Sequence, residues 1–307
     1  MISASQWFQK AEPLVYATRA GGVETVQGGH FVVVDRETGA AVQQAGVPDL
    51  PVFPRSSAKL IQGLPLVESG AASAYDLSAA HLSVACASHF GEQGHVDLVR
   101  SWLEHIGCTA DDLVCGADWP MHPEARVEVI SSGATRTSLH HNCSGKHSGF
   151  LTVCRHEGWA VAGYDDPDHP AQKRYSSNLL ALSGAAEADI KWGVDGCALP
   201  TPVLPMVDMA RALASFASCS ALSSTLRYGT RKLSESTWKP ALLDALDTLA
   251  DEYHTVDDDP QRDAYTFQKY VFVTRVMQEQ RSAEGPKPLR LLERSVFSDR
   301  MVFVRAV

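Results

Sequence analysis

The chain has 307 residues, of which 45% are hydrophobic and 21% are charged. This length is enough for one large domain with its own core, and the composition excludes a chain that is disordered throughout. The formal net charge of −9 argues against binding to nucleic-acid backbones. The sequence contains no apolar run of about 18 residues, so no membrane span is expected. The N-terminal residues lack the basic start and apolar stretch of a secretion signal, which favours a cytoplasmic protein.

The elements expected in chain order indicate a mixed fold of strands and helices. Alternating apolar residues predict antiparallel strands over residues 14–50, with a hairpin turn at residues 36–39. The remainder is mostly helical in pattern, with an amphipathic helix expected at 264–280 and a terminal strand at 295–307. Apolar residues at helical spacing predict seven further helices, at 56–67, 78–87, 96–106, 123–131, 147–157, 171–182 and 207–216.

The first group with chemical potential is the pair Ser56 and Lys59. Three residues apart at a helix start, their side chains share one face, and a lysine with a depressed pKa can deprotonate a serine. The spacing alone is weak, because it recurs at Ser236 and Lys239. From spacing alone, the simpler interpretation is a helix-capping serine followed by a solvated lysine.

The second group lies at residues 140–147, a stretch dense in histidine, cysteine and lysine. Cys143, Lys146 and His147 share one face if a helix begins here, and thiolate and imidazole groups suit zinc. Cys197 could be the distant second soft ligand that a zinc site needs. The simpler alternative is a buried cysteine beside solvated histidines.

The third and fourth groups are shorter. Asp195 and Cys197 flank Gly196 in a turn that would present both from one loop, although an ordinary Asp-Gly turn with a buried cysteine fits as well. Ser88, His89 and Glu92 follow a predicted helix. Neighbouring side chains diverge, so Ser88 and His89 are poorly placed as a nucleophile and its base, and a capped helix end is the simpler interpretation.

Taken in order, these segments resemble one family, the L-asparaginase II family of the rhizobial, thermolabile type. The specific string is Asn-Cys-Ser-Gly-Lys-His at residues 142–147, and the joint order of the segments is more specific still. The resemblance covers about residues 14–215, whereas residues 216–307 diverge, within one domain of 1–307. The segments that carry it lie at 51–59, 86–89, 91–92, 115–116, 142–147, 168–170 and 195–197.

The resemblance implies a fold like that of serine β-lactamases and penicillin-binding proteins, with helices packed on a largely antiparallel sheet, assembled as a homodimer. It implies an amidohydrolase that converts L-asparagine to L-aspartate and ammonia. It also implies the site residues by role: Ser56 as nucleophile, Lys59 as its base and Ser88 as second active-site serine; Arg55, Asp195 and His147 around the substrate; and Cys143, Lys146 and Cys197 around one zinc ion per chain. From ligand chemistry alone, His147 is a better ligand than Lys146, since a protonated lysine cannot bind a metal.

One departure keeps two alternatives open. The family has a Lys-x-Gly-Ala-Glu-Gly segment whose lysine pairs with the second serine. Here the nearest segment, at residues 280–285, places Gln280 at the lysine position. One alternative is therefore a catalytically impaired, zinc-containing relative that acts as a binding protein. The other is a β-lactamase-like serine acylase, although the companion Ser-Asp-Asn and Lys-Thr-Gly segments are missing.

Overall fold

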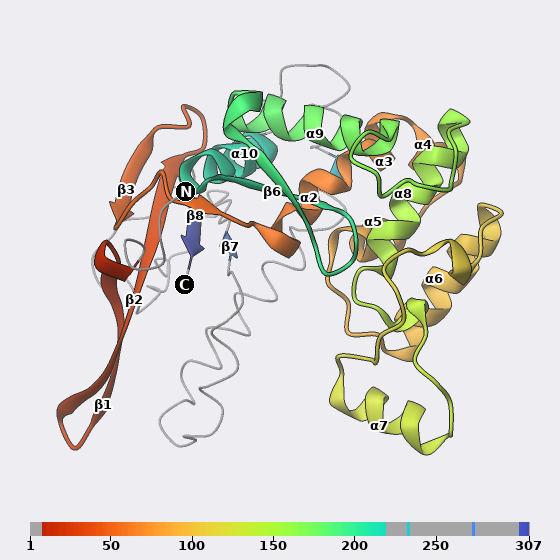
Figure 1. Cartoon of the computed structure of the whole chain (residues 1–307), viewed down its shortest axis with the longest axis horizontal. Helices are drawn as coiled ribbons and strands as arrows, with labels where there is room; N and C mark the ends of the chain where they lie inside the picture. The colour runs from red at the N-terminus through yellow and green to blue at the C-terminus, as the bar shows by residue number, and fades with distance from the viewer. Residues whose placement is uncertain (1–7, 219–231, 234–271, 274–300, 307) are drawn as a thin grey trace, which may run out of the picture.

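The computed structural model describes residues 8–218, 232–233, 272–273 and 301–306. Helices and two antiparallel sheets share this part of the chain, so the predicted mixed fold is confirmed. Figure 1 shows the larger sheet on one side and most of the helices on the other. Within the described residues, no helix is both long and apolar enough to cross a membrane.

The larger sheet is built around one long strand. The first part of β2 pairs with β1, and its last part pairs with β3 on one edge and β8 on the other. Val32, Val33 and Val34 are fully buried there, whereas the hairpin formed with β1 extends away from the body (Figure 1). The predicted hairpin turn and terminal strand are confirmed within the described residues. The strands are β1 (Glu12–Arg19), β2 (Gly22–Asp35), β3 (Ala41–Ala45), β7 (Phe272–Val273) and β8 (Met301–Ala306).

The helix predicted at 264–280 is wrong at the two residues that the structure describes there. Phe272 and Val273 form β7, which pairs antiparallel with β8. Aromatic and β-branched side chains favour strands, and residues 270–274 read Tyr-Val-Phe-Val-Thr, a composition that outweighs the helical spacing. The rest of that predicted helix lies outside the described residues, as does the segment at 280–285.

All seven helices predicted before residue 218 are present; the one at 123–131 has the predicted ends, and the ends of the others are shifted. The first is divided at Gly63, where a Cβ would lie 2.6 Å from Cys86 Sγ, and Pro65 lies in the first turn of the next helix. The α-helices are α2 (Lys59–Gln62), α3 (Leu64–Glu68), α4 (Ala71–Ala74), α5 (Ala79–Cys86), α6 (Gln93–His105), α7 (Pro123–Ser131), α8 (Ser144–Glu157), α9 (Pro170–Ser183) and α10 (Met206–Ser218). The 3-10 turns are η1 (Arg55–Ala58), η2 (Ala110–Asp112), η3 (Ser138–His140) and η4 (Glu187–Asp189).

A second, three-stranded sheet brings distant segments together and was not predicted from the sequence. Its order is β4 (Pro51–Val52), β6 (Pro200–Pro205) and β5 (Lys191–Val194). Three prolines in β6 conceal it in the sequence, because proline cannot donate to a strand ladder. The pairing of β4 with β6 places the segment that leads into η1 beside the turn between β5 and β6.

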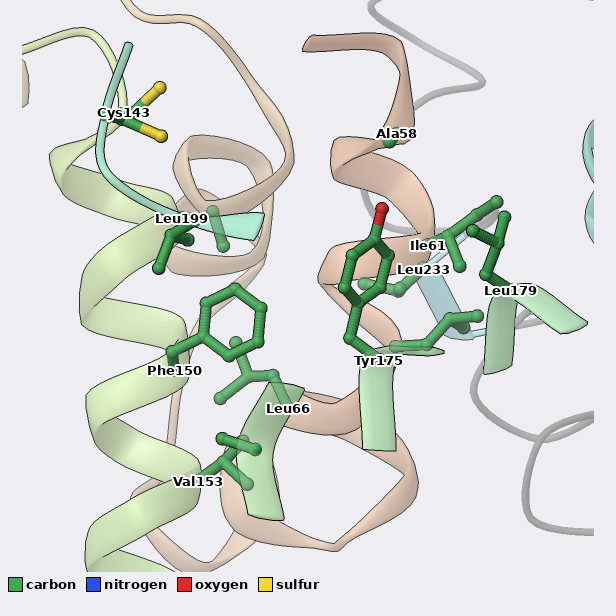
Figure 2. Packing of buried hydrophobic residues seen from close by; sticks show 14 of the residues in the cluster. Ala58, Ile61, Leu66, Cys143, Phe150, Val153, Tyr175, Leu179, Leu199 and Leu233 are labelled. Atoms are coloured by element: carbon green, nitrogen blue, oxygen red, sulfur yellow. The ribbon is translucent and has the colours of Figure 1, made fainter. Parts of the chain in front are cut away.

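Helix α8 lies at the centre of the helical part. Its residues from Ser144 to Cys154 are all buried, and α3, α4, α5, α6 and α9 pack around it. Figure 2 shows Phe150 and Val153 of this helix facing Leu66 of α3. Such complete burial explains the weak helical periodicity of its sequence, because a helix surrounded by protein needs no polar face.

Gly145 gives a stability prediction at the contact between α8 and α5. A Cβ there would lie 2.5 Å from the carbonyl oxygen of Val84, a backbone atom that cannot rotate away. We expect Gly145→Ala to lower the free energy of unfolding by about 1–3 kcal/mol in denaturant titration. Gly149→Ala is the matched control, since its Cβ would meet Leu66 and Ala85 at 3.6 and 3.7 Å, and it should gain up to about 1 kcal/mol. Equal stabilities would contradict this close packing.

Candidate functional site

The structure joins Ser56, Ser88 and Lys59 in one chain of hydrogen bonds. Lys59 Nζ lies 2.9 Å from Ser88 Oγ, which in turn lies 2.9 Å from Ser56 Oγ. Ser56 belongs to η1, Lys59 begins α2, and Ser88 follows the end of α5. Ser56 is exposed, Ser88 is half-buried and Lys59 is 1% exposed, so the chain runs from the surface into the core. Lys59 thus reaches Ser56 through Ser88.

The surroundings of Lys59 suit a base. Besides Ser88, its Nζ contacts the backbone oxygens of Ala87 at 2.7 Å and Asn142 at 3.3 Å. Carbonyl oxygens only accept, so two N–H groups of Lys59 satisfy both, and the remaining position on the nitrogen faces Ser88 Oγ. That position is an N–H donor when the amine is protonated and a lone pair when it is neutral. Burial lowers the pKa of Lys59, although the nearby Cys143 thiol partly opposes this shift.

Arg55 and Asp195 lie beside this chain and contact each other. The Arg55 guanidinium donates from Nε to Asp195 Oδ1 at 2.9 Å, and the backbone N–H of Gly196 donates to the same oxygen at 2.8 Å. Arg55 has φ +50°, an uncommon value for a residue with a side chain, immediately before Ser56. Its side chain is half exposed, so this charged pair is open to a zwitterionic ligand.

Cys143, Lys146 and Cys197 also come together, as the resemblance implies. Lys146 Nζ donates to Cys197 Sγ at 3.0 Å. Hydrogen bonding from Cys197 lowers the pKa of Cys143 to about 5, against the effect of burial. Burial by itself would lower the pKa of Lys146, but the two sulfur atoms raise it overall. Both directions favour a thiolate at Cys143 and a charged amine at Lys146.

His147 lies next to this cluster with one ring nitrogen tied down. Its Nδ1 is 2.6 Å from the Tyr164 hydroxyl, which also accepts the backbone N–H of Val114 at 3.2 Å. Its Nε2 is buried and makes no hydrogen bond of good geometry to any described residue, although it interacts with the Cys197 thiol. Burial lowers the pKa of His147 to about 4, so its ring is neutral at neutral pH.

These donors fit a zinc ion in type. Two sulfurs and one imidazole nitrogen are a common zinc donor set, and the His147 ring lies beside the Cys197 thiol with its Nε2 buried. The described part of the chain holds no group of three or more His, Cys, Asp or Glu side chains that could bind a metal. A zinc ion held by Cys143 and Cys197 therefore needs a third ligand that this grouping does not supply, such as the amine of Lys146.

Several contacts of the site could not be read from the sequence. Tyr164 lies between α8 and α9 and is part of no recognisable motif. The oxygens of Ala87 and Asn142 that contact Lys59 are backbone carbonyls, which every residue has, so the sequence gives no sign of them. The side chains of Ser88 and His89 point to different partners, as expected for neighbours in sequence. Ser88 contacts Lys59, whereas the His89 ring contacts Ser144.

A serine hydroxyl connected to a buried lysine is an arrangement typical of enzymes with an activated serine nucleophile. The chain belongs to the L-asparaginase II family, whose model matches residues 15–241. The match confirms the resemblance and extends 26 residues (241 − 215) beyond the part in which the sequence motifs were recognised. No curated protein matches the chain. At the level of the family, the activity indicated is that of an asparagine amidohydrolase.

Proposed function

We propose that this protein hydrolyses the side-chain amide of L-asparagine to L-aspartate and ammonia by acyl transfer to Ser56. The observation that carries the proposal is the hydrogen-bonded chain from Lys59 through Ser88 to the exposed Ser56. Family membership supports the substrate class. A fold like that of serine β-lactamases and a homodimeric state, both implied by the resemblance, belong to the same proposal.

The chain of hydrogen bonds suggests the order of proton movements. Ser56 Oγ bonds to the side-chain carbonyl carbon, its proton passes to Ser88, and the Ser88 proton passes to Lys59. The C–N bond then breaks, and the nitrogen takes a proton back along the same path and leaves as ammonia. Water then attacks the ester carbonyl carbon and its proton passes to Lys59. The bond from that carbon to Ser56 Oγ breaks, Ser56 takes the proton back along the same path, and L-aspartate is released.

The pair of Arg55 and Asp195 supports a role in orienting the substrate. L-Asparagine carries an α-ammonium and an α-carboxylate, and neither is desolvated cheaply without a counter-charge. The carboxylate of Asp195 can bind the α-ammonium of the substrate, and the guanidinium of Arg55 can bind its α-carboxylate. The ion pair between Arg55 and Asp195 then separates when the substrate binds. A ligand that lacks one of these charges would leave one member of the pair uncompensated.

We also propose that Cys143, Lys146 and Cys197 hold one zinc ion, with His147 adjacent. When bound, zinc would act as a Lewis acid that polarises a nearby oxygen. It would also replace the hydrogen bond between Lys146 and Cys197 and keep the lysine amine neutral. The steps above assign every proton transfer to the serines and Lys59.

The alternative of an impaired binding protein rests on Gln280, which replaces the lysine that the family pairs with the second serine. Ser88 nevertheless has a lysine partner among the described residues, namely Lys59. This contact favours the catalytic proposal. An assay of ammonia release from L-asparagine and L-glutamine separates the two functions. Release well above the uncatalysed rate supports the hydrolase, and binding of L-asparagine without release supports the alternative.

Asp195→Asn separates substrate binding from stability. Loss of a charge-assisted hydrogen bond costs about 1.5–3 kcal/mol, so we expect kcat/KM for L-asparagine to fall at least about tenfold. The melting temperature should barely change, because the amide still accepts the Gly196 N–H and the Arg55 partner is half exposed. Measuring both on one preparation checks the assignment. Unchanged kinetics together with lower stability or metal content would make Asp195 a structural partner of Cys197, whose Sγ lies 3.9 Å away.

Metal analysis of the purified protein checks the zinc proposal independently of activity. We expect about one zinc per chain, with content lost in Cys143→Ser and Cys197→Ser. Cys154→Ser is the control, since this cysteine is buried in α8, the helix that follows Cys143, but takes no part in the cluster. Zinc that is absent from the unaltered protein, or retained after both substitutions in the cluster, would refute the proposal.

A further inference from the structure

His89 is a buried histidine that the proposed chemistry does not use. It directly follows Ser88, and its ring has two hydrogen bonds. The backbone N–H of Gly91 donates to Nδ1 at 3.1 Å, and Nε2 lies 2.8 Å from the hydroxyl of Ser144, the first residue of α8. The ring therefore connects the loop that carries Ser88 to the helix that follows Cys143.

The protonation of this ring follows from its partners. A backbone N–H can only donate, so Nδ1 must accept and Nε2 must carry the proton. The Ser144 hydroxyl donates to the backbone oxygen of Leu139 at 3.1 Å, which leaves its oxygen free to accept from Nε2. Burial, reinforced by the stacked ring of His95, lowers the pKa of His89 to about 3, so the ring stays neutral at neutral pH.

Both sides of this connection support Lys59. On the loop side, Ala87 O accepts from Lys59 Nζ and Ser88 Oγ is hydrogen-bonded to it. On the side of α8, Asn142 O accepts from the same nitrogen. The loop is closely packed on the segment before α8. Gly91 has φ +72°, and a Cβ there would lie 2.7 Å from the carbonyl oxygen of His140. A small shift of this loop relative to α8 would therefore change the distances around Lys59.

We propose that His89 is a positioning residue for the amide hydrolysis. Its Nε2–H bond to Ser144 fixes the loop of Ser88 on α8, so that Ser88 stays within hydrogen-bond distance of both Lys59 and Ser56. This inference rests on the proposed function. It predicts that the Nε2–H bond, and not the presence of an imidazole, is what catalysis requires.

Two substitutions of His89 separate its two hydrogen bonds. The amide N–H of His89→Gln can reach Ser144 as Nε2 does, whereas His89→Asn accepts the Gly91 N–H but is too short to reach Ser144. We expect His89→Asn to lower kcat for L-asparagine about 100-fold with KM within about threefold, the effect of displacing reacting groups by about 1 Å. His89→Gln should recover most of that loss. Ser144→Ala removes the same bond from its other end and should match His89→Asn.

His156→Gln is the matched control. This histidine lies near the far end of α8, and its Nε2 likewise contacts an oxygen, Ser69 O at 3.1 Å. The kcat of this variant should equal that of the unaltered protein. Equal kcat for His89→Asn, His89→Gln and the unaltered protein would overturn the inference. Equal losses of kcat in His89→Asn and His89→Gln would also overturn it, because a histidine with only a structural role would not be replaced by glutamine.

A second readout keeps the inference separate from the choice of substrate. A fluorophosphonate labels an activated serine: the Ser56 oxygen bonds to phosphorus, fluoride leaves, and the serine proton passes to Lys59. We expect labelling rates, followed by intact mass, to fall in His89→Asn and Ser144→Ala and to recover in His89→Gln. The same order without ammonia release would support the role of His89 and contradict only the asparaginase proposal. Equal labelling rates, or no labelling of Ser56 in the unaltered protein, would contradict the inference itself.

Discussion

Ser56→Ala is expected to lower kcat for L-asparagine by at least about 10³-fold, because among the described residues Ser56 carries the exposed hydroxyl at the end of the hydrogen-bonded chain from Lys59. Ser88 lies deeper and already contacts both Lys59 and Ser56, so it is placed to relay a proton. The fold and the zinc content should be unchanged, since the lost hydroxyl belongs to an exposed residue. Ammonia release, circular dichroism and metal analysis on one preparation measure all three.

Ser57→Ala is the control for this substitution. It removes a neighbouring serine hydroxyl from the same turn, η1, and should leave kcat within about twofold. If Ser56→Ala retained more than a few per cent of the rate, the nucleophile would be Ser88 or water. If Ser57→Ala lost as much activity as Ser56→Ala, the loss would reflect damage to the turn and not the removal of a nucleophile.

Lys59→Met should have the second largest effect. A general base contributes about 10²–10⁴-fold, and methionine keeps an unbranched chain of similar length but cannot take a proton. We therefore expect kcat to fall within that range. Two carbonyl oxygens lose a donor, at about 1–3 kcal/mol each, whereas a buried amine no longer needs to be desolvated, so these two effects on stability oppose each other.

Lys173→Met is the matched control. This lysine is exposed and pairs with Asp168, so its loss should change neither kcat nor the melting temperature measurably. A folded Lys59→Met protein whose kcat lies within tenfold of the unaltered value would exclude Lys59 as the base. The proton would then have to pass to a group outside the chain of Ser56 and Ser88.

Local patterns of apolar residues and helix-breaking residues predicted the helices before residue 218 and the turn at residues 36–39, because these signals lie within each segment. They failed where pairing partners lie far apart in sequence. Three prolines hide the strand at Pro200–Pro205, and Phe272–Val273 pairs with β8, which lies about 30 residues further along the chain. The family match continues to residue 241, beyond residue 215, where the recognised motifs end.

The contacts of the candidate site also divide into those that the sequence indicated and those that depend on the fold. Spacing placed Ser56 and Lys59 on one helix face, but the contact through Ser88 depends on how α5 ends beside α2, which no local pattern contains. The resemblance named Cys143 and Cys197, which are 54 positions apart (197 − 143), and the structure places both in one cluster with Lys146. The burial of His89 and its hydrogen bond to Ser144 depend on how the loop after α5 packs on α8, so the sequence does not predict them.

Acyl transfer to Ser56 predicts a covalent β-aspartyl ester, and this ester can be trapped. The unaltered protein is incubated with L-asparagine in the presence of hydroxylamine, which attacks the ester in place of water. We expect β-aspartyl hydroxamate to form in proportion to hydroxylamine, and acid-quenched protein to carry an aspartyl group on the peptide that contains Ser56. Ammonia release with no hydroxamate, or hydroxamate formed equally well by Ser56→Ala, would contradict a mechanism that passes through this serine.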